Sequence, residues 1–164
     1  MDKKLEQQFV DQLEKNQNIV HKICRLYTND QDSHNDLFQE ITIQLWKAYP
    51  NFRGDAKFST WMYRVALNTA ITLYRKSKKR VKTQDYDSVM FKIASSEYDN
   101  TIEEQLKLMY AAVKQLNDIE KALVFLYLED KSYSEISDTL GITEVNARVK
   151  MNRIKGKLKQ LLNS

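Results

Sequence analysis

Apolar side chains recur every three or four residues through the first half of the chain, which is the spacing of amphipathic helices. The polar run TNDQDSHND at 28–36 interrupts this pattern. After it, Asp36 can cap a second helix that ends near Pro50, and a third helix is predicted from about Ser59 to Lys79. The first helix, from about Leu5 to Tyr27, rests on the apolar positions Phe9, Leu13, Val20, Ile23, Cys24 and Tyr27.

The pattern fades over residues 81–100, where acidic residues and serine accumulate, and this composition predicts a mobile linker. Helical spacing resumes beyond it, and a further helix is expected to open at Asn117 or Asp118. The apolar register of the helix before that point is set by Ile102, Leu106, Met109, Val113 and Leu116.

The segment SYSEISDTLGITEVNARVKMNRIKGKLKQLL, residues 132–162, predicts two helices joined by a short turn. Ser132 and Glu135 have the spacing of a capping box, so the hydroxyl and the carboxylate can each satisfy a free backbone amide. Gly141 suits a left-handed helix end, and Thr143 can cap the next helix. So short a turn makes two helices cross at a large angle, which is the form of a DNA-binding helix-turn-helix.

The last predicted helix has an apolar stripe, and its other positions are strongly basic. Residues 143–164 hold six basic side chains and one acidic side chain, a charge suited to a phosphate backbone. The simpler alternative is an amphipathic helix whose lysines only keep it soluble. The stripe consists of Ala147, Met151, Ile154, Leu158 and Leu161.

Composition supports an all-α chain, because only three glycines and one proline occur in 164 residues. We expect two small helical domains, residues 1–80 and 101–164, joined by the acidic linker 81–100. The net charge is +4, and the charged residues are unevenly distributed. Residues 64–82 are basic, residues 83–104 are acidic, and the C-terminus is basic again. Cys24 is the only cysteine and has no disulfide partner, and neither a signal core nor a membrane-spanning run is visible. A cytoplasmic protein is therefore expected.

The segment FRGDAKFSTWMYRVALNTA, residues 52–70, interleaves aromatic and cationic side chains. Aromatic rings can stack on unpaired bases while cations follow the phosphates, so this mixture suits single-stranded nucleic acid. Core packing is the alternative, favoured for Phe58 and Met62 and open for Trp61 and Tyr63. One face of the third helix forms a polar and cationic ridge made of Arg64, Asn68, Thr72, Arg75 and Lys79.

These segments together resemble the extracytoplasmic-function sigma factors of bacterial RNA polymerase. The resemblance runs from about Phe9 to Leu162 in the family's order and spacing, through DLFQEITIQLWKAYPN, FRGDAKFSTWMYRVALNTAITLYRK and SYSEISDTLGITEVNARVKMNRIKGKL. It implies a promoter-recognition subunit with a sigma-2-like domain followed by a sigma-4-like domain.

The resemblance also implies three interfaces. The second helix would dock on the coiled coil of the polymerase's largest subunit, through Asp36, Gln39, Glu40, Gln44 and Lys47. The following loop and helix would melt the minus-10 element and hold an extruded base near Asn68, with contributions from Phe52, Arg53, Lys57, Phe58, Trp61, Tyr63, Arg64, Thr72, Arg75 and Lys79. The last helix would enter the major groove of the minus-35 element, with Asn146, Arg148, Lys150, Arg153 and Lys155 as the candidate contacts.

Further partners are implied by the resemblance alone. They are the polymerase flap, and an anti-sigma factor, because many family members are held inactive by one. The family's linker leads toward the RNA exit path, but a solvated tether explains this acidic segment more simply. The chain departs from the family where a GTV-like run is replaced by Val145-Asn146-Ala147, which leaves the minus-35 sequence undefined.

No enzyme motif competes with this interpretation. His21 and His34 lack the cysteine pair of a zinc set, and Asp30, Asp32 and Asp36 lack the glycine and glutamate of an EF-hand. We expect no metal, cofactor, small-molecule substrate or membrane insertion. The remaining alternatives are a stand-alone helix-turn-helix regulator, with residues 1–80 as a sensor or dimerisation domain, and a protein-interaction adaptor whose basic surfaces bind acidic partners.

Overall fold

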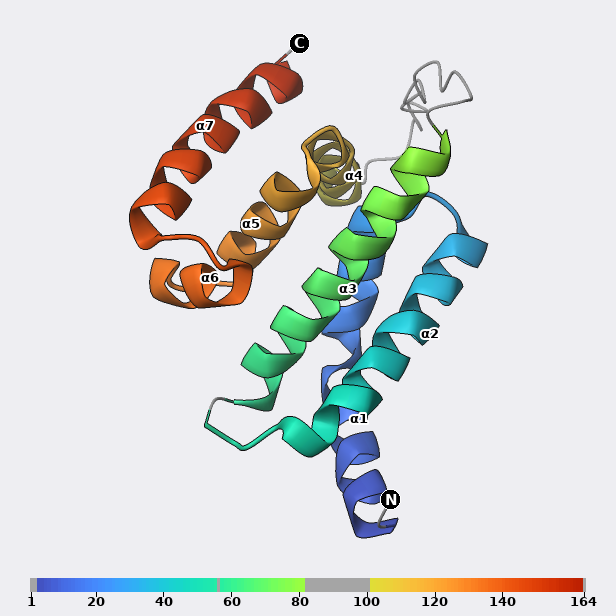
Figure 1. Cartoon of the computed structure of the whole chain (residues 1–164). Coiled ribbons are helices and arrows are strands. Elements are labelled where there is room, and N and C mark those ends of the chain that lie inside the picture. The colour runs from blue at the N-terminus through green and yellow to red at the C-terminus, as the bar shows by residue number, and fades with distance from the viewer. Residues whose placement is uncertain (1–2, 56, 82–100, 164) are drawn as a thin grey trace. The chain divides into compact units, whose positions relative to one another are not determined.

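The computed structural model describes residues 3–55, 57–81 and 101–163, and within these the regular secondary structure is helical, with no strand. Figure 1 shows two helical units, one built mainly of α1–α3 and the other mainly of α4–α7. This confirms the all-α fold with two small helical domains. Apart from Val81, the predicted linker 81–100 lies outside the described residues.

The N-terminal unit consists of α1 (Lys3–Tyr27), α2 (Gln31–Ala48), the 3-10 turn η1 (Tyr49–Asn51) and α3 (Phe58–Val81). The rings of Tyr27 and Tyr74 meet edge to face at 5.6 Å, joining α1 to α3. All three helices contribute buried side chains, so the core is a layer of interleaved aliphatic side chains. Its fully buried members include Val20, Ile23, Cys24, Ile41, Leu45, Met62, Ala66 and Leu67.

The predicted start of α2 at Asp36 is wrong by more than a turn. The helix begins at Gln31, and its cap is Asp30, whose Oδ1 accepts from the Ser33 N–H at 2.7 Å. This N–H bond is also the first cause of the lowered pKa of Asp30. Apart from the half-buried His34, residues 31–36 face solvent in the first turns of a helix, and their polarity alone resembled a loop.

Cys24 is fully buried, and burial raises the pKa of its thiol from 9.0 to about 12. The thiolate is the reactive form, so at pH 8 its population falls by about a thousandfold. We therefore expect iodoacetamide at pH 8 to leave Cys24 unmodified in the folded chain and to alkylate it within minutes in 8 M urea. Mass spectrometry of both samples measures this, and equal labelling would contradict the buried position.

The C-terminal unit consists of α4 (Thr101–Lys114), α5 (Asp118–Leu128), α6 (Tyr133–Leu140) and α7 (Glu144–Asn163). Its central helix is α5, in which residues 121–126 are all buried, and α7 packs against both α4 and α5. Asn117 opens α5 with a complete capping box, since its side chain accepts from the Glu120 N–H at 2.8 Å while Glu120 accepts from the Asn117 N–H at 3.1 Å.

The expected register of α4 places only its second half in the core. Val113 is buried, as is Leu116 in the turn after α4, whereas Ile102 is 73% exposed and Leu106 is 54% exposed. The first turns of α4 therefore carry apolar side chains at helical spacing that this unit leaves in solvent. None of the described helices is both long enough and apolar enough to cross a bilayer.

Candidate nucleic-acid interface

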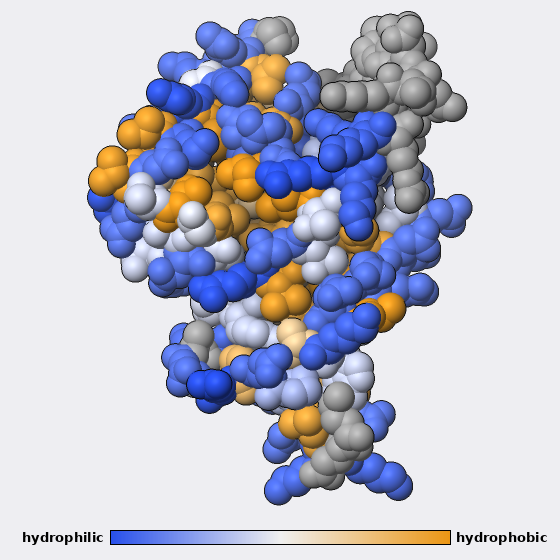
Figure 2. Space-filling model, viewed as in Figure 1, coloured by the Kyte–Doolittle hydropathy of each residue, from blue (hydrophilic) through white to orange (hydrophobic). Residues whose placement is uncertain are grey.

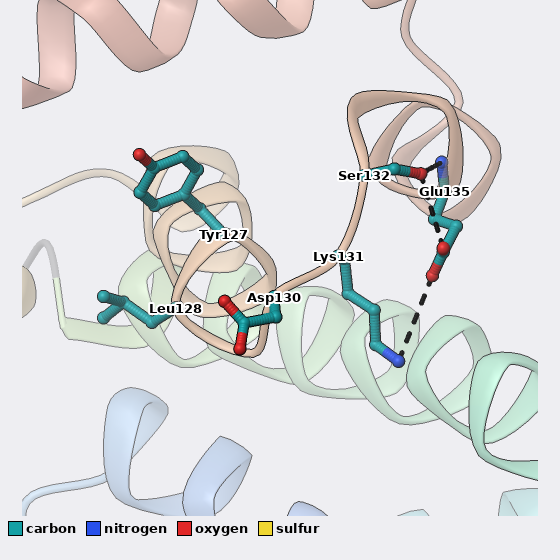
Figure 3. Close-up of a pocket in the computed structure, with 6 residues that line it drawn as sticks. All are labelled: Tyr127, Leu128, Asp130, Lys131, Ser132 and Glu135. Atoms are coloured by element: carbon teal, nitrogen blue, oxygen red, sulfur yellow. Dashed lines mark hydrogen bonds and ion pairs between the residues drawn. The ribbon is translucent and has the colours of Figure 1, made fainter.

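The turn from α5 into α6 is fixed by the predicted cap. The Glu135 N–H donates to the Ser132 hydroxyl at 3.1 Å, and that hydroxyl lies 3.4 Å from Glu135 Oε1. Figure 3 shows the Glu135 carboxylate between Ser132 and Lys131, whose ammonium is 4.0 Å away. These residues border an open hollow of about 460 Å³, and the exposed side chains of Tyr127 and Leu128 line its other side.

The turn from α6 into α7 has the expected helix-turn-helix geometry. Gly141 has φ +69°, a left-handed conformation that side chains disfavour. The Ile142 N–H donates to the Ser137 carbonyl at 3.3 Å, and the Ser137 hydroxyl donates to the Ile142 carbonyl. Thr143 then caps α7, because its hydroxyl accepts from the Asn146 N–H at 3.0 Å. Both helix ends are thereby fixed, and α7 has a defined direction relative to α6.

The buried stripe of α7 is the predicted one: Ala147, Met151, Ile154 and Leu158 are buried, and Leu161 is half-buried. The candidate minus-35 contacts lie off this stripe. Four of them, Asn146, Arg148, Arg153 and Lys155, are exposed, and Lys150 is half-buried.

Several cations of α7 are held by neighbouring side chains. The Arg148 guanidinium lies 5.1 Å from the centre of the Tyr133 ring and 3.9 Å from the Glu144 carboxylate. The Lys155 ammonium lies 4.8 Å from the centre of the Tyr127 ring. Aromatic faces attract cations, so these two tyrosines steady two predicted DNA contacts along one flank of α7. Sequence reasoning did not predict this role for either tyrosine.

On the opposite flank, the Lys157 ammonium donates to Glu120 Oε2 at 2.7 Å. Burial acts to raise the pKa of Glu120, but the hydrogen bonds from Lys157 and from the Asn117 backbone outweigh it, and the pKa is lowered. Glu120 therefore stays ionised at neutral pH and neutralises Lys157. Lys157 thus has a close carboxylate partner on another helix of the domain, whereas the carboxylate near Arg148 belongs to α7 itself and lies 3.9 Å away.

The face of α7 opposite its buried stripe is mainly uncharged. It holds Val145, Val149, Asn152 and Gly156, spaced by four, three and four residues and all exposed. Val145 is 70% exposed and Val149 is 43% exposed. This face was not predicted from the sequence, although the spacing of its residues relative to the apolar stripe indicates it.

In the N-terminal unit, the loop between η1 and α3 is anchored by an aromatic cluster. The Tyr49 ring lies 6.1 Å from Phe52, 6.1 Å from Phe58 and 6.2 Å from Trp61, measured between ring centres. Phe52 and Trp61 are themselves 5.1 Å apart. Rings in stacked, tilted and edge-to-face contact hold the two ends of the loop together.

Burial divides the aromatic residues predicted at minus-10 into two groups. Phe58 and Tyr63 are buried, so their rings serve packing, as was favoured for Phe58. Phe52 and Trp61 are half-buried and keep part of their surface outside. The cations Arg53 and Lys57 are exposed on the loop that the rings support.

The ridge on α3 is present as predicted. All five of its residues are exposed, and their spacing of four, four, three and four places them on one face of the helix: Arg64, Asn68, Thr72, Arg75 and Lys79. The Thr72 hydroxyl donates to the Asn68 carbonyl at 2.7 Å, which directs the threonine toward the helix backbone.

The candidate polymerase-docking residues lie on one side of α2. Asp36, Gln39 and Lys47 are exposed, and the half-buried Gln44 donates to Glu40 Oε1 at 3.0 Å. In their midst lies Ile43, which is 45% exposed. An aliphatic side chain surrounded by polar ones is common at protein interfaces, and the sequence analysis did not single it out.

The two histidines are neighbours between α1 and α2. His21 Nδ1 lies 3.0 Å from His34 Nε2, and the His21 ring stacks on Phe38 with 4.5 Å between centres. Burial lowers the pKa of His34, and the charges of His21 and Arg25 lower it further. Within the described residues, no three His, Cys, Asp or Glu side chains gather as a metal site would require. The pair therefore serves helix packing.

Comparison with known proteins agrees with this geometry. Residues 13–80 match the family model described as Sigma-70 region 2, and residues 106–158 match Sigma-70, region 4. The RNA polymerase sigma factor SigZ of Bacillus subtilis is 32% identical over 88% of this chain and 78% of its own. The chain belongs to the sigma-70 family, as an extracytoplasmic-function sigma factor.

Other sigma factors show the same relationship. The ECF RNA polymerase sigma-E factor of Escherichia coli is 28% identical over 71% of this chain and 68% of its own. Among solved structures, the sigma factor RpoE of Bartonella quintana, in complex with the anti-sigma factor NepR, has a TM-score of 0.74 at 16% identity and covers 95% of this sigma factor and 97% of its own chain. CnrH, in complex with the cytosolic domain of CnrY, has a TM-score of 0.69 at 17% identity. The match covers 96% of this sigma factor and 89% of the CnrH chain.

Proposed function

We propose that this sigma factor directs core RNA polymerase to promoters by holding DNA at two points, duplex at minus-35 and opened strand at minus-10. The observation that carries the proposal is the presence of two separate cationic surfaces, one on each helical unit. The two surfaces are built from different structural elements. One is a helix-turn-helix, and the other is a ridge beside an aromatic-anchored loop. We propose the domain limits 1–80 and 101–164 on this basis, with one of the two surfaces in each domain.

At minus-35, α7 enters the major groove of the duplex. Helix-turn-helix proteins read bases with the first turns of the second helix, which favours Asn146, Arg148 and Arg153 as contacts. Arginine can donate two parallel hydrogen bonds to guanine, whereas Lys150 and Lys155 are better suited to phosphates. The tyrosine rings beside Arg148 and Lys155 support these roles, because they limit the conformations of both side chains.

At minus-10, the loop at 52–57 and the ridge of α3 hold the opened non-template strand. An unstacked base exposes its Watson–Crick edge, and the Asn68 side chain offers both a donor and an acceptor to it. Phe52 and Trp61 keep exposed ring surface for stacking, while the exposed cations of the loop and ridge follow the phosphates. Phe58 and Tyr63 contribute indirectly, through the packing that shapes this surface.

For the polymerase, we propose docking of α2 on the coiled coil of the largest subunit through Asp36, Gln39, Glu40, Gln44 and Lys47, with Ile43 as the apolar centre of the contact. A second contact, with the flap, fits the hollow beside Tyr127 and Leu128, where apolar surface is exposed. Two structural relatives were solved with a bound regulator or cytosolic domain, so an anti-sigma factor is a further proposed partner.

A stand-alone regulator is the competing function, and dependence on polymerase separates the two. We expect the full chain to bind promoter fragments weakly by itself and tightly once core polymerase is added, measured by mobility shift at fixed salt. Tight, site-specific binding without polymerase would favour the regulator.

The salt dependence of DNA binding is expected to distinguish lysines that reach phosphates from the one already paired. Each phosphate neutralised adds about 0.9 to the slope of log affinity against log salt concentration. Lys155→Ala should lower the slope of the holoenzyme by about that amount, whereas Lys157→Ala, which removes a cation already paired with Glu120, should change it far less. Equal slope changes would contradict the assignment of Lys157 as internally neutralised.

A further inference from the structure

We propose that Val145 and Val149 contact thymine methyl groups in the major groove, so that α7 reads A·T pairs of the minus-35 element through apolar contacts as well as through its arginines. This inference rests on the proposed function, because it requires α7 to lie in the major groove. It assigns base readout to residues that carry no charge and no hydrogen-bonding group.

The first support is where the valines lie. They are on the face of α7 that points away from its buried stripe, with exposures of 70% and 43%. Figure 2 shows hydrophobic surface interrupting the hydrophilic side chains along α7. Val145 is the second residue of the helix and Val149 the sixth, within the turns that reach base edges in helix-turn-helix proteins.

The second support is the placement of the charges. Arg148 and Lys155 lie on one flank against tyrosine rings, and Lys157 lies on the other against Glu120. The centre of the outward face is thereby left to the two valines, Asn152 and Gly156. An uncharged surface gains little from contact with phosphates, because that contact depends on positive charge.

The third support is chemical complementarity. In the major groove the C5-methyl group of thymine is the apolar group that base pairs present, and it is read by small apolar side chains. Asn152 follows Val149 by three residues on the same face, and an amide can form two hydrogen bonds with adenine. Gly156 adds no side chain at all, so it does not hold the helix away from the groove. The whole face therefore suits A·T pairs.

The test uses holoenzyme, formed from the full chain and core polymerase, on a promoter mapped by run-off transcription. Each minus-35 thymine is replaced in turn by uracil, which removes the methyl group and keeps every hydrogen-bonding atom. At one or two positions we expect affinity to fall about fourfold, the value of one buried methyl group. The Val145→Ala and Val149→Ala variants should bind thymine and uracil at the corresponding position equally well.

Val10→Ala is the matched control, because Val10 is an exposed valine on α1 and the change removes the same atoms. This variant should keep the wild-type discrimination. The inference is overturned if uracil is bound as tightly as thymine at every position, if neither valine variant loses the discrimination, or if the mapped minus-35 element contains no thymine on either strand. If the holoenzyme starts at no specific site, the proposed function itself fails, which is a different outcome from normal initiation without methyl sensitivity.

Discussion

Replacing Asn68 by alanine is expected to reduce transcription from duplex promoters by roughly 5- to 150-fold, the range that corresponds to losing 1–3 kcal/mol of base recognition. The side chain is exposed on the ridge of α3, so the loss should come from DNA contacts and not from unfolding. On a template whose minus-10 region is already unpaired, part of the defect should disappear, because the polymerase no longer has to open the strands. Run-off assays on the two templates measure the difference.

Asn18→Ala provides the control for this experiment. It removes the same amide from an exposed position on α1, a different helix from the ridge, and should transcribe both templates like the wild type. If Asn68→Ala lost the same fraction of activity on duplex and on unpaired templates, the residue would act before or after melting, and its role at an extruded base would be refuted.

Replacing Arg153 by alanine is expected to weaken promoter binding by the holoenzyme by a similar factor, while leaving its affinity for core polymerase unchanged. Arg153 is exposed beside the outward face of α7, where a guanidinium can pair with guanine through two hydrogen bonds. Fluorescence anisotropy of labelled promoter and of labelled core polymerase measures the two affinities separately.

Lys107→Ala changes the net charge by the same amount at an exposed position of α4 and should leave promoter binding close to wild type. A general electrostatic effect would make the two variants alike, and this would remove the case for a specific contact. Loss of core binding by Arg153→Ala would instead show that α7 belongs to the polymerase interface.

The helices and the helix-turn-helix could be predicted because they depend on local rules. Apolar spacing located α1, α3, α5 and α7, while a capping serine at 132, a glycine at 141 and a capping threonine at 143 defined the turn. The start of α2 could not be predicted in the same way. Solvent-facing helical turns and loops share a polar composition, and only the Asp30 cap distinguishes them.

What the sequence left open are contacts between elements distant in sequence. Tyr133 and Tyr127 meet Arg148 and Lys155 only because the fold brings α5 and α6 beside α7. The same is true of Glu120, which neutralises Lys157 across 37 residues. The interleaved aromatics of residues 52–63 had two possible roles, and burial assigns Phe58 and Tyr63 to packing.

Packing also determines which basic side chains of α7 are held by other residues of the domain. A sequence shows how many basic residues α7 has, but their availability to DNA depends on which of them the domain itself holds. The structure leaves an uncharged outward face between two flanks, one steadied by tyrosine rings and the other paired with a carboxylate.

Run-off transcription with core polymerase, across a library of genomic fragments, tests the two-point account most directly. Addition of the full chain should produce transcripts that start at defined positions, preceded by a shared minus-10 element and a shared minus-35 element at fixed spacing. Asn68→Ala should reduce starts at these positions through the first element, and Arg153→Ala through the second. Transcripts with no common start site, or starts that depend on only one of the two elements, would contradict the account.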